Sequence, residues 1–421
     1  MRGGAGFFIA LRYLLGRAHE GGRYLRGAAT GIALSLVPII VTLIVADGMI
    51  GGITDRYLEL GTGHLQVYNF RNPGQIDSVV PLLENLEGIR GVWAEQHGLG
   101  VLVGKQGKTG GTIRAIEASF WEDPGSRAYL VTVAGEAKIT ADQDVLLGEA
   151  LAGSLQVGVG DTIRIMTIRL SSEGRTIPRM TPFTVRGIIS SGYRELDALW
   201  CIIGYEAGKK ILPSDVSSSY LMVKMQDPYR QADSMAPFLR EFLGSGYSVY
   251  TWKELQQSQY RSYESTRQLL LFIMALIVLV AAVNVSSATS MLVIERQRDI
   301  AVLKSAGASP RATSGIFLWG SFLTGLTGAI IGIGAGLFLG STINGIIHGL
   351  EGVLGFFSRI FRKEEVKILD PGYYLETIPI IIDWTAVVLI GIFTIFSSIL
   401  ASWIPARRAG KLRPLEILRK Y

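Results

Sequence analysis

Four long apolar runs restrict what this chain can fold into. A helix needs roughly 20 consecutive apolar residues to cross the hydrocarbon core of a bilayer, where it must satisfy its own backbone hydrogen bonds. Each run reaches that length, so we expect four transmembrane helices with soluble segments between them. The expected spans cover residues 27–50, 264–294, 315–347 and 384–404.

The first run could be mistaken for a secretory signal peptide. It is longer than the apolar region of such a peptide, and the leader before it, residues 1–26, is also too long. We therefore expect an uncleaved membrane anchor. Within the leader, Phe7–Leu15 predicts either a helix lying on the membrane surface or simply the start of the first span.

Lysine and arginine cluster in three segments that flank the spans: the leader, residues 295–310, and the tail, residues 405–421. Four spans place these segments on one side of the membrane, and basic flanks indicate the cytoplasmic side. We therefore expect both termini in the cytoplasm, with residues 51–263 and the link 348–383 outside. The net charge of +6 comes from these clusters and indicates no nucleic-acid partner.

Residues 51–263 have the composition and patterning of a soluble domain. Short stretches such as His64–Tyr68, Thr162–Ile168 and Tyr247–Thr251 predict strands, and Ala232–Leu243 predicts a helix. The expected fold is therefore four transmembrane α-helices with a large α+β domain inserted between the first and second.

No catalytic or metal-binding constellation stands out in the sequence. Gly107-Lys108-Thr109 resembles the end of a phosphate-binding loop, but Leu102 stands where that loop requires its first glycine. The four histidines lack metal-ligand spacing, and the single Cys201 excludes an intrachain disulfide. We expect a non-enzymatic chain with no cofactor or metal of its own. If ATP drives it, another chain binds the ATP.

Residues 295–310, between the second and third spans, predict a short amphipathic helix. Charges alternate with an apolar face, and Gly307 and Pro310 end the helix. The segment is either a solvated turn or a knob that docks into a cleft of a partner. The residues assigned to the knob are Glu295, Arg298, Asp299, Ile300, Leu303, Lys304 and Gly307.

Glycine recurs at every fourth position of the third span. Gly328, Gly332, Gly336 and Gly340 would form a bare ridge that another helix can approach closely. Glycine is common in membrane helices, but four in register favour a packing face.

The motifs resemble, in order, the permeases of MacB/FtsX-type ABC transporters. Residues 299–308 (DIAVLKSAGA) look like the coupling-helix signature, and 403–418, which contain WIPARRA and PLEIL, look like the closing motif. Residues 8–14 (FIALRYL), 31–34 (GIAL) and 373–379 (YYLETIP) resemble more narrowly the lipoprotein-releasing branch, the LolC/LolE type. The resemblance extends over nearly the whole chain.

The resemblance implies a transport machine in a bacterial inner membrane. Two permease subunits, either two copies or two related chains, would pair with a dimeric ABC ATPase that binds ATP and Mg²⁺. The ATPase would push on the coupling helix, and spans one and two would carry the push to a MacB-like outer domain. A lipoprotein would then leave the membrane lipid for a soluble periplasmic carrier.

The resemblance also implies binding residues. A cavity for the acyl chains would be lined by Thr42, Val45 and Ala46 in the first span and by Tyr373, Tyr374 and Ile378 in the outer link. The family's carrier-recruiting hairpin maps to about residues 170–180, where it is short, with Pro178 and Arg179 as docking residues.

The chain departs from the family's pattern at two points in the first span. Pro38 should kink or locally break the helix, and Asp47 stands where the family usually has Asn. Two other functions stay open: an efflux permease of the MacB type, and an FtsX-type regulator of a periplasmic hydrolase. The YYLETIP-like link argues against the first, and the large outer domain argues against the second.

Overall fold

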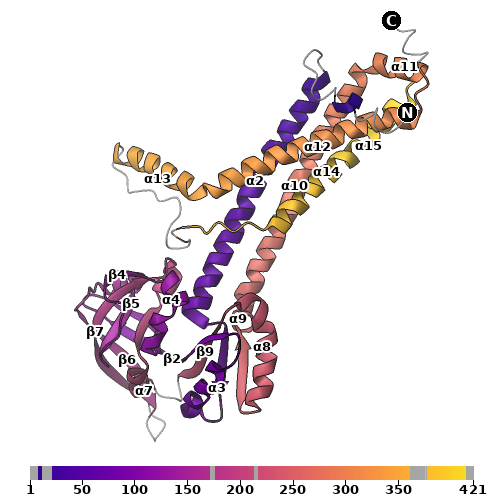
Figure 1. The fold of residues 1–421 in the computed structure, drawn as a ribbon. Helices are drawn as coiled ribbons and strands as arrows, with labels where there is room; N and C mark the ends of the chain where they lie inside the picture. The colour runs from indigo at the N-terminus through magenta and orange to yellow at the C-terminus, as the bar shows by residue number, and fades with distance from the viewer. Residues whose placement is uncertain are drawn as a thin grey trace. The chain divides into compact units, whose positions relative to one another are not determined.

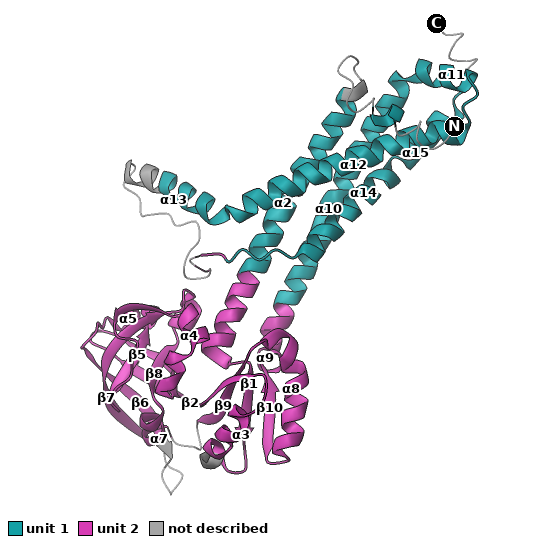
Figure 2. Ribbon diagram, viewed as in Figure 1, with its two compact units in different colours: residues 1–48, 263–364, 379–421 teal, residues 49–262, 365–378 magenta. Residues whose placement is uncertain are grey.

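The computed structural model describes residues 8–11, 21–170, 176–212, 217–360, 375 and 377–413. The chain divides into two compact units (Figure 2). The helical unit comprises residues 1–48, 263–364 and 379–421, and the mixed unit comprises residues 49–262 and 365–378.

Four long helices lie side by side in the helical unit (Figure 1). They are α2 (Gly21–Arg56), α10 (Gln257–Glu295), α12 (Pro310–Ser341) and α14 (Trp384–Ala401). All four are long and apolar enough to cross a membrane. Three shorter helices accompany them: α11 (Gln297–Ser305), α13 (Ile343–Ile360) and α15 (Trp403–Lys411).

Helix α2 is continuous through Pro38. Proline removes one amide donor, and in a membrane helix the packing of neighbouring helices compensates for that loss. The residues that follow, Ile39 and Ile40, are buried in the core that α2 shares with α10, α12 and α14. Of the two outcomes expected at Pro38, a kink or a local break, the break is therefore wrong.

The third span ends at Ser341, before the end of its apolar run at Ile347. The chain leaves the helix at Thr342, whose amide and hydroxyl both donate to the carbonyl of Phe338, at 3.2 and 3.0 Å. The remaining apolar residues belong to a separate helix, α13, which starts at Ile343.

The mixed unit is built on a 10-stranded sheet. Its strands run in the order β10-β1-β9-β2-β3-β8-β5-β7-β4, and β6 pairs with β2 and β7. The strands are β1 (Leu65–Asn69), β2 (Ile89–Val103), β3 (Lys108–Ile116), β4 (Val131–Gly135), β5 (Asp144–Gly148), β6 (Thr162–Leu170), β7 (Thr176–Ser190), β8 (Trp200–Gly204), β9 (Ser218–Met225) and β10 (Tyr247–Thr251).

Short helices cover this sheet. They are α3 (Val80–Glu84), α4 (Pro124–Tyr129), α5 (Glu149–Leu155), α6 (Arg194–Asp197), α7 (Tyr205–Ile211), α8 (Pro228–Leu243) and α9 (Trp252–Leu255), together with η2 (Pro73–Val79) and η3 (Ala118–Glu122). A further element, η1 (Tyr57–Thr62), continues α2 as a π-helical turn. The arrangement confirms a mixed α/β domain between the first and second long helices.

Helix α8 shows how local sequence fixes an element of this unit. The Asp227 carboxylate accepts from the amides of Tyr229 and Arg230, and Pro228 occupies the first turn, where its missing amide costs nothing. Ala232, Ala236 and Leu239 fall on one face and enter the core with β1, β9 and β10. A second core lies under α5 and α7, around β5 and β8.

Candidate functional site

The C-terminal end of helix α11 is formed by a turn at Gly307. Gly307 has a φ of +91°, which favours a residue without a side chain. The amides of Gly307 and Ala308 donate to the carbonyls of Lys304 and Leu303, both at 3.0 Å, forming a Schellman motif. Gly307 therefore shapes the helix end, and Ser309 then caps α12 by accepting from the amide of Ala312.

The inner face of α11 packs on its own unit. Ile300 is only 2% exposed, and with Ala301 it lies in a buried position. Ile300 belongs to an apolar cluster with Phe317 of α12 and Ala406 and Ala409 of α15. Ile300 was assigned to the docking knob, but its side chain packs α11 against α12 and α15.

The Lys304 side chain also points inward, toward the end of α15. Its Nζ donates to the carbonyl oxygens of Gly410 at 2.8 Å and Leu412 at 2.5 Å. These are unpaired carbonyls at the end of α15, where a cation also complements the helix dipole. Lys304 therefore ties α11 to the C-terminal helix.

The outer face of α11 presents a different set. Arg298 and Val302 of α11 are exposed, as are Glu295 at the end of α10 and Gly307 after the end of α11. Asp299 pairs with Arg296 at 3.2 Å. Val302 is 62% exposed although it is apolar. Sequence reasoning missed Val302, although its position four residues after Arg298 places both on one helical face.

The glycines of α12 lie against α2. A Cβ added at any of the four would come within 2.5–2.8 Å of an isoleucine or leucine side-chain atom of α2, closer than real Cβ atoms approach. The facing pairs are Gly328–Ile32, Gly332–Leu36, Gly336–Ile40 and Gly340–Ile44. Both numbers rise by four at each step, so the two helices run in the same direction in register.

The residues expected to line an acyl-chain cavity are only partly placed. Thr42, Val45 and Ala46 share one face of α2, which is exposed or half-buried, whereas Ile40 and Ile44 face the glycines. Ile378 is buried within the mixed unit. Tyr373 and Tyr374 lie outside the described residues.

An ion cluster joins three of the long helices. Arg267 of α10 pairs through Nε with Asp47 of α2 at 3.0 Å, and through Nη2 with Asp383 at 2.5 Å. Asp383 also caps α14 by accepting from the amides of Thr385 and Ala386. Sequence reasoning noted Asp47 but not its partners, because the three residues are far apart in the chain.

The β6–β7 hairpin carries Pro178 and Arg179 on exposed positions. Ile168 is paired with Pro178, and Met166 with Met180, so these residues form an apolar strip on one face. Arg179 donates to the carbonyl of Lys210 at 3.0 Å. The residues between the two strands, 171–175, lie outside the described part.

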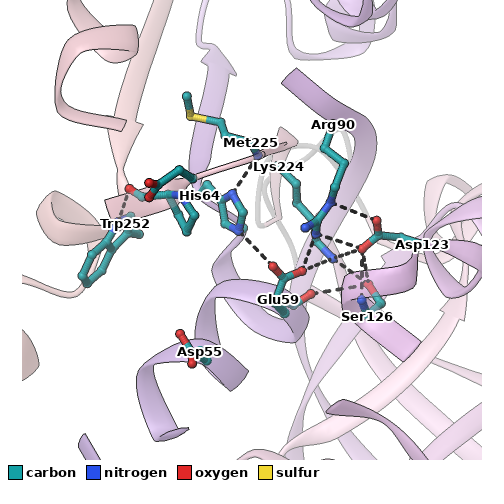
Figure 3. A network of polar contacts seen from close by, with 12 residues as sticks. Asp55, Glu59, His64, Arg90, Asp123, Ser126, Lys224, Met225 and Trp252 are labelled. Carbon is teal, nitrogen blue, oxygen red and sulfur yellow. Dashed lines mark hydrogen bonds and ion pairs between the residues drawn. The ribbon is translucent and has the colours of Figure 1, made fainter. Parts of the chain in front are cut away.

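Within the mixed unit, the turn that ends the first long helix is fixed by buried charges (Figure 3). Glu59 of η1 pairs with Arg90 of β2 at 2.5 Å and with the buried Lys224 of β9 at 3.2 Å. Lys224 also pairs with Asp123 at 2.8 Å, and burial lowers the pKa of this lysine against the pull of that carboxylate. The turn therefore cannot separate from the sheet without breaking both ion pairs of Glu59.

Arg114 of β3 also binds the same turn. Its guanidinium donates to the carbonyls of Leu60 at 2.7 Å and Gly61 at 3.2 Å, and pairs with the buried Glu95 at 2.6 Å. Burial alone would raise the pKa of Glu95, but the charges of Arg114 and His97 lower that pKa to about 2. The pair stays ionised and holds the end of the helix.

The described residues contain no group of His, Cys, Asp and Glu arranged to hold a metal ion. The polar clusters are ion pairs and helix caps, and Cys201 is fully buried. Such contacts fix helices and strands to one another.

Comparison with known proteins covers almost the whole chain. Residues 27–236 match the MacB-like periplasmic core domain, and residues 271–414 match the FtsX-like permease C-terminal domain. The periplasmic region of MacB from Actinobacillus actinomycetemcomitans aligns with 48% of this chain and 95% of its own, at 16% identity and a TM-score of 0.32.

Two curated relatives match over nearly their full length. The lipoprotein-releasing system transmembrane protein LolC of Neisseria meningitidis is 26% identical over 98% of both chains. The corresponding LolE of Haemophilus influenzae is 24% identical over 99% of both. The MacB-like core domain is followed along the chain by the FtsX-like C-terminal domain, and the two matches cover most or all of each of the four long apolar helices. This chain therefore belongs to the MacB/FtsX-like superfamily of ABC transporter permeases and is similar throughout to its LolC/LolE lipoprotein-releasing branch.

Proposed function

We propose that this chain is the membrane subunit of an inner-membrane ABC transporter that extracts lipoproteins and passes them to a periplasmic carrier. The observation that carries the proposal is the similarity to LolC and LolE proteins along 98–99% of the chain. In this proposal a separate ATPase dimer hydrolyses ATP, and this chain, paired with a second permease subunit, transmits the work. Both termini and α11 lie in the cytoplasm.

The outer face of α11 supports a docking role. An exposed valine beside Arg298 offers an apolar contact rimmed by charge, as the centre of a small protein interface requires. The inner contacts of Ile300 and Lys304 tie α11 to α12 and α15. A push on Val302 would therefore move the bundle rather than α11 alone.

Two features support transmission through the first span. Helix α2 is continuous from Gly21 to Arg56, and the four glycines of α12 contact it over about three turns. At its far end, Glu59 and the carbonyls of Leu60 and Gly61 are fixed to strands by Arg90, Lys224 and Arg114. A displacement of the end of α2 would thus act on strands β2, β3 and β9, to which η1 is bound.

The lipid anchor needs an apolar path. Each buried CH₂ contributes ~0.8 kcal/mol, so three chains of ~16 carbons come to roughly 35–40 kcal/mol. The free energy of exposing these chains to water is therefore too high for exposure to occur during one transport cycle. The face of α2 that carries Thr42, Val45 and Ala46 is free of the glycine contacts, which supports its role as one wall of such a path.

Carrier docking is assigned to the β6–β7 hairpin. Its exposed apolar strip, with Pro178 next to Arg179, suits a carrier that must itself bind acyl chains in an apolar site.

Depletion of the chain in its own bacterium tests the proposal. We expect mature lipoproteins to accumulate in the inner membrane, as measured by membrane fractionation and acyl-specific labelling. Purification of the chain should also recover an ABC ATPase. Normal lipoprotein sorting after depletion would overturn the proposal.

A further inference from the structure

The helix α13 takes no part in the proposed function. It begins at Ile343, directly after Thr342 ends the third span, and Figure 1 shows it turned away from the other helices of its unit. Its first residues, 343–347, had been assigned to the span itself, and its other residues lie in the predicted link 348–383.

The apolar side chains of α13 follow one stripe. They recur at spacings of three and four, which is the period of a single helical face. Between them lie Asn344, the ion pair of His348 and Glu351 at 3.5 Å, and several glycines. The stripe consists of Ile343, Ile346, Ile347, Leu350, Val353 and Leu354.

The second half of this stripe is exposed, whereas Ile343, Ile346 and Ile347 are half-buried. Leu350 is 51% exposed and Val353 is 54% exposed. Single exposed apolar residues are ordinary on a protein surface, but a stripe in helical register indicates a surface that is covered in use.

The position of α13 identifies what covers it. The apolar part of α12, from Ile316 to Leu339, rises about 36 Å at about 1.5 Å per residue, slightly more than the ~30 Å hydrocarbon core. The end of α12 therefore lies at the level of the lipid headgroups, and α13 starts there. Among the described helices four qualify as spans, and α13 is not one of them.

We propose that α13 is a membrane-interface helix whose apolar stripe rests on the acyl chains of the leaflet in which the third span ends. With the orientation proposed above, this is the outer leaflet. The glycine face points to water. A short helix with an apolar stripe and a polar opposite side lies in the plane of the interface.

Cysteine scanning of the full chain in liposomes tests this placement. Leu350→Cys and Val353→Cys report on the stripe, and Gly345→Cys and Gly352→Cys report on the opposite side. At both glycines an added Cβ would meet no atom within 4 Å, so these controls fit the fold. The native Cys201 is fully buried, and the parent protein should not be labelled.

Each cysteine carries an environment-sensitive fluorophore, which is quenched either by iodide in water or by lipids with a shallow nitroxide. We expect nitroxide to quench positions 350 and 353 at least threefold more than positions 345 and 352, and iodide to show the reverse. Equal iodide quenching at all four would place α13 in water. Protection of the stripe from both quenchers would show that protein covers it. Either result overturns the proposal, and neither depends on lipoprotein release.

Discussion

The Nζ of Lys304 lies 2.8 Å from the carbonyl oxygen of Gly410, which joins α11 to the end of the C-terminal helix α15. Two elements separated by the whole third and fourth spans are thus held together at one end of the helical unit. A residue first assigned to contact a partner therefore holds α11 in place.

Removal of this contact should loosen α15. Lys304→Met keeps the aliphatic stem but leaves the carbonyls of Gly410 and Leu412 without their cationic donor, at a cost of about 1.5–3 kcal/mol for hydrogen bonds to a charge. We expect faster amide exchange across residues 403–411, measured by mass spectrometry. Lys411→Met, on an exposed position, is the control. Equal exchange in the two variants would contradict the contact.

Substitutions of Val302 and Ile300 should affect two different properties, docking of the ATPase and stability of the fold. Val302→Glu should abolish co-purification of the ATPase while leaving thermal stability unchanged, because the side chain is exposed. Ile300→Ala should lower the free energy of unfolding by about 2–4 kcal/mol through the cavity it leaves. ATPase binding that survives Val302→Glu in a folded protein would remove the outer face of α11 as the docking surface.

The glycine ridge should be sensitive to single methyl groups. Gly332→Ala places a Cβ 2.8 Å from that of Leu36, and overpacking of this kind costs about 1–3 kcal/mol. Gly334 lies on the same helix with nothing within 4 Å of an added Cβ, so Gly334→Ala should be neutral or slightly stabilising. Thermal unfolding in detergent distinguishes the two, and similar melting temperatures would argue against close contact of α2 and α12.

The ion cluster of Arg267 should hold the start of α14. Arg267→Gln leaves Asp47 and Asp383 without their shared cation, so the two carboxylates repel each other. We expect a wider distribution of distances between spin labels on α2 and α14, measured by electron paramagnetic resonance. Arg261→Gln, six residues earlier on an exposed position, should leave the distribution unchanged. An unaltered distribution in Arg267→Gln would show that packing alone fixes the three helices.

Acid should destabilise the mixed unit through Glu95. The pKa of Glu95 is lowered in the fold from 4.5 to about 2, so its contribution is complete above pH 4.5 and is lost as the pH falls towards 2. Glu95→Gln should flatten the stability curve in this window. It should also destabilise the unit at neutral pH by about 3–5 kcal/mol, because Arg114 loses its buried partner.

Tryptophan fluorescence of the full chain in detergent measures this dependence. Glu136→Gln is the matched control, because Glu136 pairs with Arg186 in an exposed position where water screens the charges. An unchanged pH profile in Glu95→Gln would exclude the Glu95–Arg114 pair as its source.

The number and type of long helices could be predicted from the sequence, because a bilayer imposes length and composition on each span separately. The spacing of the α12 glycines likewise identified a close-packing face, although it did not name α2 as the neighbour. The strands around Leu65, Thr162 and Tyr247 followed from alternation.

Contacts between distant segments could not be predicted. Alternating charge and apolar residues in α11 predicted an amphipathic helix, but which face is inward depends on α12 and α15, and Val302 was therefore overlooked. The partners of Glu59 come from β2 and β9, far along the chain, and the apolar pattern continues through Thr342 where the helix stops. Hydropathy does not locate such a point, because the residues on both sides of it are apolar.

The four-residue period of the α12 glycines also sets which changes of length this segment can tolerate. One inserted residue turns everything beyond it by about 100°, which would carry the remaining glycines away from α2, whereas four inserted residues return them to within about 40° of their place. We expect natural sequences of this type to vary in the connections around the third span, and to keep the number of residues between Gly328 and Gly340 fixed.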